Sequence, residues 1–161
     1  MAKFEYKFQT LLDLKEQLEE QAKNEFGKVM ARLNREKEKL RRIEASITMS
    51  IEEFRVISGG RFTAETIKRY NAFIKKMKEN AVEQKQVIID AEEEVEAARQ
   101  LLVKAVQERE KFEKLEEKEY DKFFEEEKRQ DNMIIDELVS YRSGSKSDGE
   151  KREKTRESRE G

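Results

Sequence analysis

The stretch that decides the fold is residues 64–105, AETIKRYNAFIKKMKENAVEQKQVIIDAEEEVEAARQLLVKA. Residues suited to a helix–helix contact recur in it every seven positions, in two series offset by three. The first series is Ile67, Ile74, Ala81, Ile88, Val95 and Leu102, and the second is Tyr70, Met77, Gln84, Ala91, Ala98, Ala105 and, just beyond the stretch, Phe112. Two such series predict one long α-helix that packs in a left-handed coiled coil.

The segment before residue 58 carries the same pattern. Its two series are Phe26, Leu33, Leu40, Ile47 and Phe54, and Ala22, Val29, Ile43 with the polar exceptions Glu36 and Ser50. The earlier apolar residues Phe4, Phe8, Leu11 and Leu18 are out of phase with Phe26 by one residue. This offset predicts a stutter near Ala22 and Phe26, where the supercoil relaxes locally.

A Gly pair in Ser58-Gly59-Gly60 separates the two patterns. Glycine adopts the left-handed conformation that ends many helices, so we expect a turn here. Thr63 then suits the N-cap of the next helix, and Glu65 suits its first turn. The sequence predicts an all-α, antiparallel coiled-coil hairpin over residues 1–142, with helices at 3–57 and 64–141 and a loop at 58–63.

Folding the chain about residue 60 sets which side chains meet. It brings Leu33 near Ile88, Phe26 near Val95 and Phe8 near Phe112. At 1.5 Å per residue, the first helix would be about 80 Å long and the second about 115 Å. Roughly 20–25 residues of the second helix would therefore extend past the first.

This predicted extension is not polar. Its apolar residues are Tyr120, Phe123, Phe124, Met133, Ile134, Leu138 and Tyr141. An apolar stripe on an unpaired helix calls for a partner, with fraying or self-association as the alternatives. From Ser143 onward no apolar residue appears, so we expect residues 143–161 to form a disordered, charged tail.

Composition excludes several function classes. The chain has 35 basic and 37 acidic residues and contains no Cys, His or Pro. Without His or Cys it lacks the parts for a Ser–His or Cys–His nucleophile and for a zinc site, so we expect no enzyme, cofactor or metal. The mixed charge argues against nucleic acid as a partner, and no apolar run is long enough for membrane insertion. The absence of Cys favours the cytoplasm.

Three groups of residues resemble the FliJ family, a component of the bacterial flagellar type III export apparatus. Phe4-x-Tyr6-x-Phe8-Gln9-x-Leu11-Leu12-Asp13-Leu14-x-Glu16 resembles its opening, and Tyr70-x-x-Phe73-Ile74 resembles its early second helix. Ala105-x-x-Glu108-Arg109-x-x-x-Glu113-Lys114-Leu115, with Arg129 and Asp136-Glu137, resembles its later part. The resemblance covers residues 3 to about 141, and the tail is not part of the pattern.

The resemblance implies a fold similar to the central stalk of rotary ATPases and a role in flagellum biogenesis, protein export and hence motility and chemotaxis. The implied partners are the hexameric export ATPase, the cytoplasmic domain of the export gate, and export chaperones that the chain escorts. The implied location is the cytoplasm, peripherally associated with the inner face of the cell membrane at the flagellar base. The alternatives are the stalk of a virulence-type secretion system or rotary ATPase, and a generic coiled-coil scaffold.

The resemblance also assigns residues to two surfaces and no catalytic residue. The implied ATPase-binding residues are Phe4, Phe8, Leu11, Leu12, Phe123, Phe124, Met133, Ile134 and Leu138. The implied gate-binding residues are Phe73, Met77 and Ile43. Ser46 and Ser50 stand where some members of the family carry aromatic residues.

Overall fold

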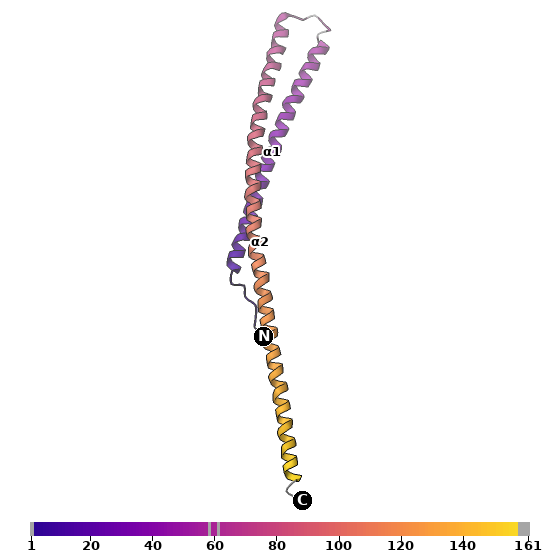
Figure 1. The fold of residues 1–161 in the computed structure, drawn as a ribbon. Coiled ribbons are helices and arrows are strands. Elements are labelled where there is room, and N and C mark those ends of the chain that lie inside the picture. Colours follow the sequence, from indigo (N-terminus) through magenta and orange to yellow (C-terminus); the bar gives the residue numbers. More distant parts are fainter. Residues whose placement is uncertain (1, 58, 61, 158–161) are drawn as a thin grey trace. The chain divides into compact units, whose positions relative to one another are not determined.

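The structure, a computed structural model, describes the backbone of residues 2–57, 59–60 and 62–157 and the side chains as far as residue 146. Within these residues it contains two α-helices and no strand: α1 (Gln9–Ile57) and α2 (Ala64–Glu157) (Figure 1). The predicted all-α hairpin is confirmed. The chain divides into two compact units, Thr10–Glu110 and Met1–Gln9 with Lys111–Gly161.

The unit Thr10–Glu110 is an antiparallel coiled coil with a thin core. Leu33, Ile88 and Ala91 form its buried cluster, and Leu40 and Val95 pack against it. The predicted proximity of Leu33 and Ile88 is therefore confirmed. Ala91 is only 1% exposed, and its small side chain leaves room for the larger Leu33 in the shared contact. Each helix buries one stripe and exposes the rest, as the two seven-residue series require.

The polar exceptions in the two series meet each other. The Gln84 side-chain amide donates to the backbone carbonyl of Glu36 at 3.0 Å and to its carboxylate at 2.7 Å. Along the flanks, Arg32 pairs with Glu94 at 2.7 Å and Lys37 pairs with Glu92 at 3.2 Å. Polar pairs in and beside a coiled-coil seam favour one register over its neighbours.

The predicted stutter near Ala22 is wrong, because the series of the first helix continues unbroken toward its N-terminus. Leu12 and Glu19 are buried at seven-residue spacing ahead of Phe26, whereas Leu11 and Leu18 are both 41% exposed. The apolar residues that implied a phase shift thus lie beside the seam. Glu19 can occupy the seam because the Arg109 guanidinium and the Lys23 ammonium bind its carboxylate.

The turn between the helices differs from the expected one. Gly59 and Gly60 do not adopt a positive φ, so the predicted left-handed glycine is wrong at both positions. The Gly60 N–H donates to the Ile57 carbonyl at 2.9 Å. This bond spans three residues instead of the four of an α-helix, so it tightens the end of α1. The Thr63 N-cap is confirmed, since its Oγ1 accepts from the Thr66 N–H at 3.3 Å.

Gly59→Ala should therefore leave the hairpin intact and raise its free energy of unfolding by up to about 1 kcal/mol, because alanine restricts the unfolded chain. A Cβ at Gly59 would lie 3.6 Å from the Val56 carbonyl, an ordinary contact. Urea unfolding followed by circular dichroism measures the change. Gly27→Ala is the matched control, because Gly27 lies within α1 and a Cβ added there would have no atom within 4 Å. A loss of more than 1 kcal/mol at Gly59 alone would contradict the turn geometry.

In the unit Met1–Gln9 with Lys111–Gly161, residues 2–6 have no regular secondary structure and α1 begins at Gln9, not near residue 3. Phe4, Tyr6 and Phe8 alternate, and alternation with a period of two suits an extended segment rather than a helix. The Phe8 and Phe112 rings lie 6.5 Å apart, so the predicted contact between them is confirmed.

The second helix also ends later than expected. The sequence predicts an end near residue 141 with disorder after it, but α2 continues to Glu157. Residues 142–157 contain no Pro and are rich in Glu, Lys and Arg, which propagate a helix once it has started. Residues 158–161 lie outside the described part of the chain.

Candidate functional site

The aromatic residues near the N-terminus pack within their own unit. The Phe4 ring lies 5.2 Å from Tyr120 and 5.5 Å from Phe123. The Tyr6 hydroxyl donates to the Phe112 carbonyl at 2.9 Å, and burial, with smaller effects from Glu119 and Glu116, raises its pKa. Of the residues implied to bind the ATPase, Phe4, Phe8 and Phe123 are thus half-buried by contacts inside the chain.

Leu11 and Leu12, implied to bind the same partner, face different surroundings. Leu12 is 3% exposed, so it stabilises the coiled coil and is not accessible to a partner. Its neighbour Leu11 is exposed beside the seam, together with Leu14 and Leu18. The structure therefore removes Leu12 from the accessible surface and keeps Leu11 on it.

The later part of α2 carries most of the large exposed apolar side chains that the structure describes in its unit. The exposed fractions of its apolar side chains lie between 51% and 78%, for Tyr120, Phe124, Met133, Ile134, Ile135, Leu138, Val139 and Tyr141. Phe124, Met133, Ile134 and Leu138 were assigned to a binding surface by resemblance. Sequence reasoning did not single out Ile135 and Val139. Their positions directly after Ile134 and Leu138 could have indicated that they lie beside the same apolar surface.

Helical geometry sorts these residues into one continuous face. We define the C-terminal stripe as Tyr120, Phe124, Glu127, Asp131, Ile134, Leu138 and Tyr141, which are separated by alternating steps of four and three residues. This spacing places them along one side of α2. A hollow beside it is lined by three stripe residues, Ile134, Leu138 and Tyr141, and by three residues from outside the stripe, Asp136, Glu137 and Ser140. Met133 lies about 140° around the helix axis from Leu138 and is not part of the stripe.

Of the three implied gate-binding residues, the structure leaves one well exposed. Phe73 is 47% exposed, one position before Ile74 of the seam. Met77 and Ile43 are half-buried members of the two seams, and the Met77 sulfur lies 4.0 Å from the Asn80 amide nitrogen. A partner at this level of the hairpin would therefore meet Phe73 first.

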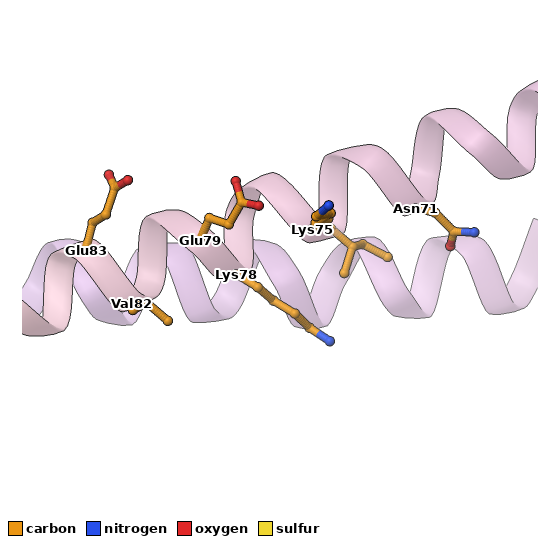
Figure 2. A pocket seen from close by; sticks show the side chains of 7 residues that line it. Asn71, Lys75, Lys78, Glu79, Val82 and Glu83 are labelled. Atoms are coloured by element: carbon orange, nitrogen blue, oxygen red, sulfur yellow. The ribbon is translucent and has the colours of Figure 1, made fainter.

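A shallow hollow lies nearby on α2, lined by Asn71, Ile74, Lys75, Lys78, Glu79, Val82 and Glu83. Figure 2 shows Lys78 and Val82 pointing to one side of the helix and Glu79 and Glu83 to the other. Neither Phe73 nor Met77 lines this hollow. Its mixed charges and single exposed valine are typical of an ordinary helix surface.

Among the side chains that the structure describes, the most buried charged group is one that sequence reasoning missed. The Glu19 carboxylate accepts from the Arg109 guanidinium, and Lys23 binds it at 2.9 Å. Bonds from Lys23 and Arg109 lower the pKa of Glu19 against the opposing effect of burial. The signal in the sequence was its position, seven residues before Phe26 and therefore in the seam. The cluster fixes how α1 faces α2 within this unit.

In the part of the chain that the structure describes, no helix is long and apolar enough to cross a membrane. The same residues contain no group of three or more acidic side chains placed to hold a metal ion.

The comparison with known families settles the family. Residues 4–147 match the model of the family described as "Flagellar FliJ protein". The chain belongs to the FliJ family. Among curated protein sequences, none matches the chain. Family membership identifies this FliJ-family chain as a component of a type III export apparatus.

A solved structure shares the fold of this FliJ-family chain. It is that of CT670 from Chlamydia trachomatis, titled as a putative YscO homologue, with a TM-score of 0.58 and 24% sequence identity. The match covers 86% of this chain and 94% of CT670. At this identity, the likeness concerns the arrangement of the helices.

Proposed function

We propose that this FliJ-family chain acts as the stalk subunit of the flagellar export apparatus and binds the ring of the export ATPase through the C-terminal stripe. The observation that carries the proposal is the exposed apolar face of α2 between Tyr120 and Tyr141. Exposed apolar side chains that gather on one side of a helix mark a surface that binds a partner. Membership of the FliJ family supports the export ATPase as the partner.

The structure changes which residues we expect to reach the ATPase. Phe124, Ile134 and Leu138 are exposed and share one side of the helix, so they are the proposed anchors. Phe4, Phe8 and Phe123 instead take part in the ring contacts between the N-terminal residues and α2, and they support the anchors indirectly. Met133 and Leu11 are exposed but lie off the stripe, and we expect a smaller contribution from them.

The same proposal places the export gate at the level of Phe73, and includes the escort of export chaperones. It places the protein in the cytoplasm, held at the inner face of the membrane at the flagellar base by its partners. In this proposal the gate-binding residue Phe73 belongs to the coiled coil Thr10–Glu110, and the ATPase-binding stripe belongs to the other unit. No catalytic step is assigned to the chain itself.

The double variant Phe124→Ser and Leu138→Ser should weaken binding to the purified flagellar export ATPase at least tenfold, because buried aromatic and aliphatic anchors dominate such interfaces. Biolayer interferometry with immobilised protein measures the affinity, and ATP hydrolysis by the ATPase is the second readout. Val82→Ser with Ile89→Ser, two exposed apolar residues elsewhere on α2, is the matched control and should bind normally.

Two outcomes would overturn the proposal. One is wild-type protein that neither binds the ATPase nor stimulates its hydrolysis. The other is a double variant that binds as well as the wild type while remaining helical by circular dichroism. Binding to a virulence-type secretion ATPase in preference to the flagellar one would assign the chain to that related system instead.

A further inference from the structure

The C-terminal stripe has an internal order that its apolar residues alone do not explain. Read along α2, it runs apolar (Tyr120, Phe124), then acidic (Glu127, Asp131), then apolar again. The second apolar part is Ile134, Leu138 and Tyr141. Alternating steps of four and three are the spacing of a coiled-coil seam, so the two acids stand where apolar residues would complete a second seam.

We propose that this acidic gap, Glu127 and Asp131, prevents the stripe from pairing with a second copy and selects a partner helix that is apolar at both ends and carries Lys or Arg in the middle. This inference rests on the proposed function, whose ATPase-binding surface it refines. The occupant of the stripe is thus an amphipathic, centrally basic helix of another protein.

The stripe carries enough apolar side chains to invite pairing with a second copy. Each of them, like Ile135 and Val139 beside them, is more than half exposed. Exposed apolar side chains on one side of a helix favour self-association unless something opposes it. The composition of the gap supplies that opposition.

Both orientations of a dimer would bury uncompensated carboxylates. In a parallel pair, Glu127 faces Glu127 and Asp131 faces Asp131, which adds repulsion to desolvation. In an antiparallel pair the two seven-residue series face each other, so Asp131 faces either Glu127 or Ile134 of the copy. A carboxylate inside a seam is tolerated only when a cation is close, as Arg109 and Lys23 are to Glu19 in the other unit.

The nearby basic residues Lys128 and Arg129 do not neutralise the gap. Arg129 pairs with Glu126 at 3.5 Å, on a different side of the helix from Asp131, and among the described residues Lys128 forms no ion pair with Glu127 or Asp131. The gap therefore offers its charge to an incoming partner, and a helix with Lys or Arg at the matching level would be favoured over one without.

The first test asks about self-association and needs no partner. Wild-type protein should remain monomeric in sedimentation equilibrium at tens of micromolar, about the range in which weak dimers form. Glu127→Leu with Asp131→Leu should complete the seam and tighten self-association at least tenfold. Glu125→Leu with Asp136→Leu replaces two acids on another side of the same helix and is the matched control, expected to remain monomeric. A wild-type dimer that Leu138→Ser dissociates, or a leucine variant that stays monomeric, would overturn the proposal.

The second test asks about the partner, with the purified flagellar export ATPase as the probe. Glu127→Lys with Asp131→Lys should weaken its binding at least tenfold, and Glu127→Gln with Asp131→Gln should reduce the salt dependence of binding. Unchanged binding by the lysine variant would overturn the inferred basic partner. If wild-type protein does not bind the ATPase at all, the proposed function fails, and the self-association test still decides whether the acidic gap blocks dimers.

Discussion

Leu33→Ala is expected to lower the free energy of unfolding by about 3 kcal/mol, the largest effect of any single truncation in the coiled coil. Leu33 is 6% exposed and shares its buried cluster with Ile88 and Ala91. The methyl side chain of Ala91 is too small to fill the space that Leu33→Ala would leave. The cost therefore combines lost burial with a cavity that can close only if the helices move together.

Urea unfolding of the full chain, followed by circular dichroism at 222 nm and analysed for the midpoint and slope, measures this loss. Leu18→Ala is the matched control, because it makes the same chemical change on the same helix at an exposed position. We expect it to cost less than about 1 kcal/mol. Equal losses at Leu33 and Leu18 would contradict the observed phase of α1, since they would mean that both leucines are buried to the same extent.

Arg109→Ala should be the second most damaging change, with a loss of about 2 kcal/mol. It removes one of the two cations bound to the Glu19 carboxylate, whose side chain is 8% exposed. Lys23 would remain, so the charge would be left partly, not wholly, uncompensated. The same unfolding experiment measures the loss, and Arg99→Ala, which breaks an exposed pair with Glu96, is the control.

A double-mutant cycle separates the charge from the packing of Arg109. Glu19→Leu places an apolar residue in the seam and should leave stability unchanged or raise it. In that background Arg109→Ala should cost less than about 1 kcal/mol, because no buried carboxylate remains to be left unpaired. If Arg109→Ala costs the same with and without Glu19, then Arg109 acts through its own packing. The ion pair would then not be what keeps Leu12 and Glu19 in the seam of α1.

The pH dependence of stability has a sign that follows from the same pair. The pKa of Glu19 is lowered from its ordinary value of 4.5 by its bonds to Lys23 and Arg109. Its ionised form therefore adds stability above pH 4.5, and that contribution is lost as the pH falls through the lowered pKa. The stability difference between the wild type and Glu19→Gln should accordingly shrink as the pH is lowered below 4.5, and a constant difference would count against the pair.

Much of the fold followed from the sequence because its information is local and periodic. Seven-residue spacing defines which face of a helix is apolar, and a Gly pair between two such patterns defines where the chain turns. Counting outward from the turn then gave the contacts of Leu33 with Ile88 and of Phe8 with Phe112. Thr63 at the N-cap followed from the needs of the first helical turn.

The tertiary structure decided which residues near the start of α1 are buried, a question that the local sequence pattern left open. Near the start of α1, Leu11 and Leu18 offered one phase and Leu12 and Glu19 another, and apolarity alone favoured the first. The structure chose the second because a cation 90 residues away in the sequence, on Arg109, compensates the buried Glu19. The placement of the non-helical residues 2–6 depends likewise on distant rings, those of Tyr120 and Phe123 for Phe4. Periodicity therefore determined that two helices pair, whereas contacts between residues far apart in the chain determined which apolar side chains were left exposed for a partner.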